Sequence, residues 1–146
     1  MLPRWYYTYV WFAVAIARME GYMDQDFRLL SGNRAVRNRN PGNIRNWSSR
    51  LPKDSGNFTI FPSDADGWAA LFRQIGLNIN RDLTLAEFFG GKPGVYAGYA
   101  PSFENNTANY VNFVRQFVRD MDGVDFGNRS LKDVFNELGW NGWPIS

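Results

Sequence analysis

The fold is decided by residues 5–21, which read WYYTYVWFAVAIARMEG. Between residues 5 and 17 the only polar side chain that is not aromatic is Thr8. This run is shorter than the roughly 20 apolar residues that cross a bilayer. Because it is apolar on most sides, we predict a helix surrounded by the core, with Pro3 in its first turn. The alternative is the apolar core of a signal peptide, preceded by Arg4. So many large aromatic residues are untypical of such a core.

Glu20 extends the apolar stripe of this predicted helix. Counting back from Glu20 in helical steps reaches Ala17, Ile16, Ala13, Phe12 and Tyr9. Apolar surroundings disfavour the charged form of a carboxyl group, so we expect the pKa of Glu20 to be raised. A carboxylic acid of that kind acts as a general acid near neutral pH. The alternative is that Glu20 marks where the helix leaves the core and faces water.

The chain of 146 residues contains neither cysteine nor histidine. This excludes disulfides, thiolate or imidazole metal ligands, and nucleophilic catalysis of the Ser-His-Asp or Cys-His type. Acid–base chemistry then falls to a carboxylate, a lysine or a tyrosine. We therefore expect an activity that needs no metal and no cofactor.

Basic residues are unevenly distributed, although the net charge is only +2. The segment between residues 28 and 53 has no acidic residue and seven basic ones, namely Arg28, Arg34, Arg37, Arg39, Arg45, Arg50 and Lys53. Such a segment indicates an anionic partner, either a nucleic acid or a carboxylate-bearing polymer. A solvated basic loop without a partner is the alternative. The 6 Trp, 7 Tyr and 12 Phe residues fit an aromatic core, a stacking surface, or both.

The rest of the chain predicts a mainly α fold, with residues 1–146 forming a single helical domain. Residues 40–43 (NPGN) predict a type II turn in which Gly42 takes a positive φ. Residues 43–47 and 58–61 predict a small β-hairpin. Capping patterns and apolar periodicity predict further helices, which start after Ser63, Thr84 and Ser130 and span about residues 107–121. We expect the helix over residues 107–121 to bury Met121. We also expect the C-terminal tail to dock through Trp140 and Trp143.

Several motifs in this order resemble the lysozyme-like superfamily, and most closely its phage-associated and bacterial muramidases and lytic transglycosylases. The matching segments are Ala15–Gly21, Arg37–Ile44, Phe58–Pro62, Asp66–Leu71, Tyr99–Pro101, Glu104–Thr107 and Tyr110. The resemblance covers roughly residues 8–118 and implies an α+β lysozyme-like fold. It also implies cleavage of the β-1,4 bond between N-acetylmuramic acid and N-acetylglucosamine, with Glu20 as the catalytic acid.

Departures from the family pattern leave the reaction subtype open. Lytic transglycosylases carry Glu-Ser where this chain has Glu20-Gly21, and the turn at residues 40–43 replaces their Gly-Leu-Met-Gln segment. Arg39 replaces one Asn of the branch's Asn run. The missing segment favours hydrolysis of the muramidase type. The alternative is transglycosylation, which produces 1,6-anhydro ends.

Polar and aromatic residues of the matching segments are candidates for binding the glycan strand. They are Asn40, Asn43, Tyr99, Glu104, Asn105, Asn106 and Tyr110. Each also has an ordinary structural interpretation as a turn, cap or core residue. A second catalytic carboxylate would come from Asp24, Asp26, Asp64, Asp66 or Glu104. The basic segment could meet carboxylates of the peptide stems, with Arg45 and Arg50 nearest a groove.

The expected partner is therefore peptidoglycan, acted on at the bacterial cell wall by a monomer. We expect neither stable membrane insertion nor nucleic-acid binding. One rival hypothesis is a nucleic-acid-binding module in which Phe27, Trp47 and Phe58 alternate with the basic residues. Another is a wall-binding virion protein without chemistry. The sequence leaves the route of export open.

Overall fold

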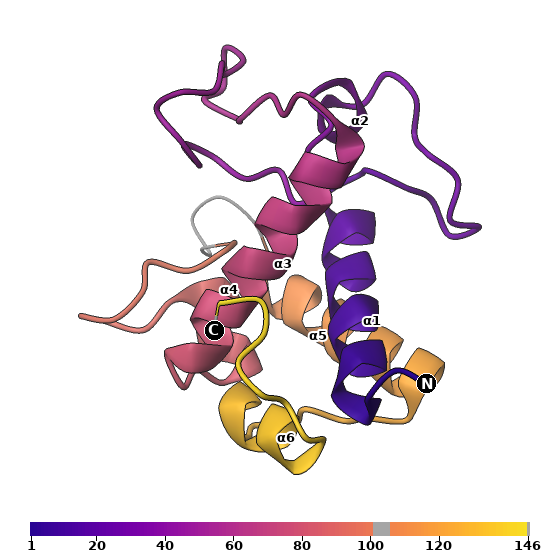
Figure 1. Ribbon diagram of the computed structural model, residues 1–146, viewed down its shortest axis with the longest axis vertical. Coiled ribbons are helices and arrows are strands. Elements are labelled where there is room, and N and C mark those ends of the chain that lie inside the picture. Colours follow the sequence, from indigo (N-terminus) through magenta and orange to yellow (C-terminus); the bar gives the residue numbers. More distant parts are fainter. Residues whose placement is uncertain (101–105, 146) are drawn as a thin grey trace. The chain divides into compact units, whose positions relative to one another are not determined.

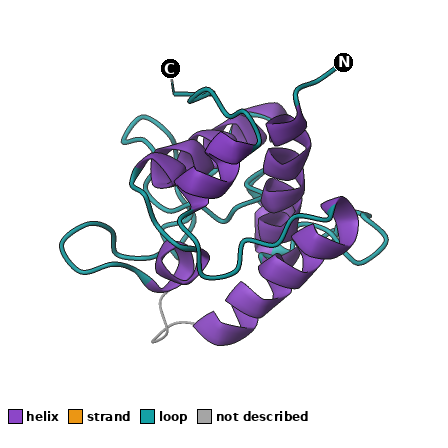
Figure 2. Ribbon diagram, turned by 90° about the horizontal axis from the view of Figure 1, so that it is seen from below, coloured by secondary structure: helices purple, strands orange, loops and turns teal. Residues whose placement is uncertain are grey.

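The computed structural model describes residues 1–100 and 106–145 and is mainly helical, which confirms the predicted helical class. Within these residues the helices are α1 (Arg4–Met19), α2 (Arg34–Arg37), α3 (Asp64–Asn80), α4 (Leu85–Gly90), α5 (Thr107–Asp122) and α6 (Leu131–Glu137) (Figure 1). Loops and turns join them (Figure 2). The chain forms two compact units, one of residues 1–15 with 75–146 and one of residues 16–74.

The first helix is buried along the predicted stripe. Its fully buried side chains include Tyr9, Phe12, Ala13, Ile16 and Ala17. Tyr7, on the other side of the helix, is 43% exposed. Within the described residues, no helix is both long and apolar enough to cross a membrane.

The unit of residues 1–15 and 75–146 has an aromatic core. Phe12 meets Phe88 with ring centroids 5.2 Å apart, and Phe126 at 5.4 Å. The predicted capping box at the start of α4 is present, because Thr84 and Glu87 each bond the other's backbone N–H. The tail docks as expected, with Trp143 against Trp5 at 5.7 Å.

Burial of Met121 is a wrong prediction, since this side chain is 40% exposed. It lies in the last turn of α5, which ends at Asp122. The buried side chains of that helix are Tyr110, Val114, Phe117 and Val118. The apolar face that packs therefore ends one turn before the helix does.

The predicted hairpin in the unit of residues 16–74 is reduced to isolated bridges. Phe58 pairs with Arg45, and the adjacent Thr59 pairs with Lys53. The Asn40 side chain bonds two backbone groups that a longer ladder would pair, because its Oδ1 accepts from the Ile44 N–H and its Nδ2 donates to the Thr59 carbonyl oxygen. The adjacent ladder bond, from Thr59 N–H to the Ile44 carbonyl oxygen, is present at 2.9 Å. Competition of this kind between side chains and strand ladders is common for Asn. The short helix α2 was not predicted.

The turn at residues 40–43 also differs from the prediction. Asn43 N–H donates to the Asn40 carbonyl oxygen at 3.0 Å, so a turn forms there. Gly42 has no positive φ, whereas Asn43 has a φ of 46°. The type II assignment is therefore wrong, and the left-handed residue is Asn43, a residue type that tolerates this conformation.

Candidate active site

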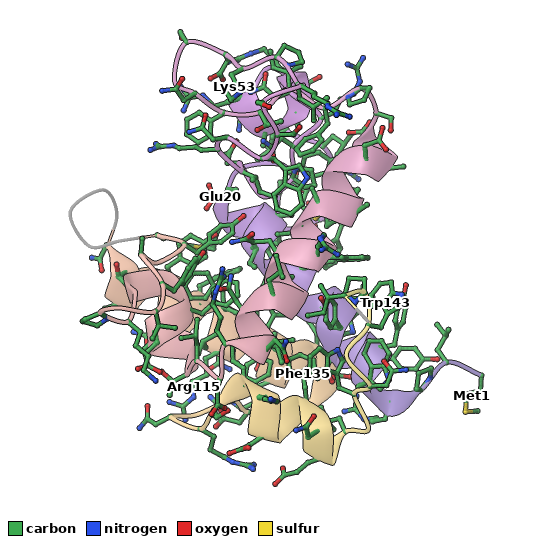
Figure 3. All side chains as sticks on the ribbon, turned by 60° about the vertical axis from the view of Figure 1, so that its left-hand side comes forward. Met1, Glu20, Lys53, Arg115, Phe135 and Trp143 are labelled. Carbon is green, nitrogen blue, oxygen red and sulfur yellow. The ribbon has the colours of Figure 1, made fainter. Side chains whose placement is uncertain are left out.

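Glu20 occupies the C-cap of α1 in a Schellman motif. Tyr22 N–H donates to the Ala17 carbonyl oxygen at 3.0 Å, and Gly21 N–H donates to that of Arg18 at 3.2 Å. These are the two bonds that define the motif, whose left-handed position is filled here by Gly21 with a φ of 79°. The Glu-Gly pair thus sets the direction in which the chain leaves the helix. Figure 3 shows Glu20 at this end of α1.

Asn43 connects the turn to Glu20. Its Nδ2 donates to the Glu20 carbonyl oxygen at 3.0 Å and to the carboxylate oxygen Oε1 at 3.2 Å. One amide therefore satisfies a carbonyl at the helix end and also contacts the carboxylate. Among the described residues, the Oδ1 atom of Asn43 is buried and accepts no hydrogen bond.

Asn40, three residues earlier, holds the turn itself. Its side chain is 0% exposed. Oδ1 accepts from the Ile44 N–H at 2.9 Å, in addition to the two bonds that Nδ2 donates. The amide is thus engaged at both ends by backbone groups. Of the two asparagines of this turn that are predicted to bind the glycan, Asn43 is therefore the one that contacts Glu20.

The first turns of α3 support this arrangement. A Cβ built at Gly67 would collide with the Arg39 carbonyl oxygen and lie 2.9 Å from Pro41 Cδ, so only glycine admits the turn here. Tyr22 donates its hydroxyl to Asp64 at 2.8 Å. Burial and the neighbouring Asp64 carboxylate raise the pKa of Tyr22 to about 12, so the phenol stays neutral and remains a donor. These contacts hold Tyr22, which follows Glu20 by two residues, and the backbone of the turn against α3.

A second asparagine, which no motif of the sequence indicates, holds the segment that follows α1. Asn33 Nδ2 donates to the Gly21 carbonyl oxygen at 3.1 Å. Gly21, two residues after the last residue of α1, is the sequence signal for the end of this helix. No local pattern points to Asn33, because it lies 12 residues from its acceptor.

The candidates for a second carboxylate have local structural contacts. Asp24 accepts from the backbone N–H groups of Asp26 and Arg28, bonds that lower its pKa. Asp66 pairs with Ser63 at the start of α3, at 2.8 Å. Asp64 accepts from Tyr22 as described above. Glu104 lies outside the described residues.

The remaining predicted binding residues belong to the other unit. Tyr110 is 3% exposed and packs on Phe89 with ring centroids 4.3 Å apart. Tyr99 is half-buried and stacks on Phe88 at 5.6 Å. Asn106 is exposed and caps α5 by accepting the Asn109 N–H. Asn105 lies outside the described residues.

Part of the basic segment is held by intramolecular contacts. The guanidinium carbons of Arg34 and Arg45 lie 4.3 Å and 4.5 Å from the centroid of the Phe58 ring, within cation–π distance. Arg34 also pairs with Asp54 at 3.3 Å. The Asp54 carboxylate organises this loop, because it accepts from Asn38 and from two backbone N–H groups, and these bonds lower its pKa.

Comparison of the chain with protein-family models, curated protein sequences and solved structures found no match. Within the described residues, no group of three or more acidic side chains could hold a metal ion. The described residues place the helix-end carboxyl group of Glu20 in contact with Asn43.

Proposed function

We propose that the protein cleaves peptidoglycan glycan strands at the β-1,4 bond between N-acetylmuramic acid and N-acetylglucosamine, with Glu20 as the general acid. The observation that carries the proposal is the bond from Asn43 Nδ2 to Glu20 Oε1 at 3.2 Å. A catalytic acid must be held in a defined position relative to the bond that it protonates. The bond orients the carboxyl group, and the helix end fixes its backbone.

The position of Glu20 suits proton donation. In this proposal Glu20 begins the reaction as the neutral acid, with Asn43 Nδ2 at its Oε1 atom. The neutral acid would protonate the leaving glycosidic oxygen as the bond to the anomeric carbon breaks. The resulting oxocarbenium-like centre would be supported by the acetamido group of the substrate. Glu20, now a carboxylate, would then take a proton from the acceptor.

The acceptor determines the product. Attack by water gives hydrolysis with a reducing end, and attack by the C6 hydroxyl of the muramic residue gives a 1,6-anhydro end. We propose hydrolysis, because the chain lacks the Gly-Leu-Met-Gln segment of the transglycosylases that it otherwise resembles. Mass spectrometry of the released fragments distinguishes the two products.

The test compares digestion of purified peptidoglycan by the wild type and by Glu20→Gln. Glutamine keeps the oxygen that accepts from Asn43 and loses only the transferable proton. We expect the rate to fall by about 100-fold or more, the usual contribution of a general acid. Glu137 lies on α6 and forms an exposed ion pair with Arg129. Glu137→Gln is the matched control and should digest peptidoglycan at the wild-type rate. Equal digestion by Glu20→Gln and wild type would exclude the proposed role.

A further inference from the structure

A pocket of about 470 Å³ lies beside α3 in the unit of residues 16–74. One wall is a face of α3 formed by Asp66, Ala69, Ala70 and Arg73, which are spaced by helical steps. The other wall is the loop containing Trp47 and Arg50. The small side chains of the two alanines leave the space open. Its volume is in the range of sites that bind small ligands.

Two arginines of this pocket have guanidinium groups without a partner among the described residues. Arg50 and Arg73 are both exposed, and within the described residues neither guanidinium makes an ion pair or a hydrogen bond. In contrast, Arg34 pairs with Asp54, and Arg115 pairs with Asp125. A guanidinium presents a planar fork of N–H donors that matches a carboxylate. The pocket therefore offers two such donors to an external anion.

The pocket also has an aromatic wall and one carboxylate. Phe61 is 2% exposed, whereas Trp47 is half-buried, and both residues line the pocket. The backbone of Trp47 is held because its N–H donates to Thr59 Oγ1 at 3.1 Å. Asp66 is fixed by its bond to Ser63. The lining thus combines two cations, one anion and an apolar surface.

We propose that this pocket binds the peptide stem of peptidoglycan, with a stem carboxylate at Arg50 and Arg73. This inference rests on the proposed function for the identity of the polymer. Asp66 suits the ammonium group of a diamino acid, and Trp47 suits an aliphatic portion of the peptide. A polyphosphate such as a nucleic acid fits less well, because it brings only negative charge to a pocket that contains a carboxylate.

The first test measures binding of a free stem tetrapeptide that contains a diamino acid, using titration followed by NMR chemical shifts. Arg50→Gln and Arg73→Gln should each weaken binding about tenfold or more, the usual effect of losing a hydrogen bond to a charged group. Ala69→Leu should weaken it too, since leucine fills the pocket without changing charge. Lys132→Gln, on α6, makes the same charge change outside the pocket and should bind normally.

The second test separates this inference from the proposed function. Wild type and variants digest intact peptidoglycan and glycan strands stripped of peptides by an amidase. The ratio of the two rates should fall about tenfold in Arg50→Gln and Arg73→Gln and stay unchanged in Lys132→Gln. If no glycan is cut by the wild type, the proposed function fails and the peptide titration alone decides this inference.

Two results would overturn the inference. One is tetrapeptide binding that is absent or equal in wild type, Arg50→Gln and Arg73→Gln, even if Glu20-dependent cleavage holds. The other is tighter binding of a single-stranded oligonucleotide at the same residues, with affinity falling steeply as salt rises. That second result would assign the pocket to nucleic acid.

Discussion

At the level of single residues, the two turn asparagines show how one residue type serves two purposes. Asn40 is buried and its amide bonds only to backbone groups of its own unit. Asn43 is half-buried, has a positive φ and bonds to Glu20 through both the carbonyl and the carboxylate oxygen. Burial and partner geometry separate the roles, because the two side chains are chemically the same.

Replacing Asn43 by Asp should impair glycan cleavage more than it impairs folding. Asp tolerates the left-handed conformation and has the same shape, but it cannot donate to Glu20 and adds a like charge beside it. We expect about a 100-fold loss in the rate of peptidoglycan digestion. Asn57→Asp, at another positive-φ asparagine, is the control. A variant that digests at the wild-type rate would show that this bond does not position Glu20.

Gly21→Ala tests whether the helix cap positions Glu20. A Cβ at Gly21 meets left-handed strain of about 1–2 kcal/mol and lies 3.3 Å from Asn33 Nδ2. Gly123→Ala, at the C-cap of α5, has the same left-handed strain but no neighbour within 4 Å.

Both glycine variants should lose a similar free energy of unfolding, measured by urea denaturation. Only Gly21→Ala should also slow glycan cleavage, because only its cap carries the carboxyl group. If the two variants cleave equally well, the cap is a stability device alone.

At the level of elements, α3 supports the turn by approaching its backbone closely. The contact depends on the absence of a side chain at Gly67, since the Arg39 carbonyl oxygen lies where a Cβ would stand. Glycine within a helix costs about 1 kcal/mol relative to alanine. The helix nevertheless has a glycine at position 67, because packing of residues 39–41 against it outweighs the higher helix propensity of alanine.

Gly67→Ala should therefore destabilise the protein despite the better helix former. The propensity gain of about 1 kcal/mol opposes a collision with backbone, and overpacking costs about 1–3 kcal/mol. We expect a lower denaturant midpoint with the helix content by circular dichroism retained below it. Ala65→Gly, an exposed site in the same helix, isolates the propensity and should cost no more than about 1 kcal/mol. A more stable Gly67→Ala would contradict the close contact.

Elements defined by local contacts were predictable from the sequence. The caps formed by Ser63, Thr84 and Ser130 are present where the patterns placed them, because each bond spans only three residues. The length of the hairpin was not predictable, because the Ile44 N–H and the Thr59 carbonyl oxygen bond to the side chain of Asn40, which lies outside the two predicted strands. The α2 helix has four residues, too few for a periodic pattern to show.

At the level of the whole molecule, stability should fall in acid because several carboxylates are held ionised. A side-chain bond from Arg115 lowers the pKa of Asp125 to about 2, and a bond from Asn38 lowers that of Asp54. A depressed pKa contributes stability above the unfolded value, near 3.9, and loses it as pH falls through the folded value. The loss should therefore run from about pH 5 to about pH 2.

Asp125→Asn isolates one of these groups. The variant should be less stable than wild type at pH 7, and the difference should shrink as the pH approaches 2, followed by urea denaturation at each pH. Asp26→Asn removes an exposed carboxyl group that has no ion-pair partner within the described residues. This control should track the wild type. A constant difference for Asp125→Asn across the range would contradict the pKa assignment.

The sequence by itself determined the helical class, the buried stripe of α1 and the caps, since all follow from periodicity and bonds between near neighbours. Only the tertiary structure decided which asparagine contacts Glu20, that Asn33 bonds the Gly21 carbonyl oxygen, and that Arg50 shares a pocket with Arg73. These contacts join residues 12 to 23 positions apart in the chain. No local pattern encodes them, because they depend on how the segments pack.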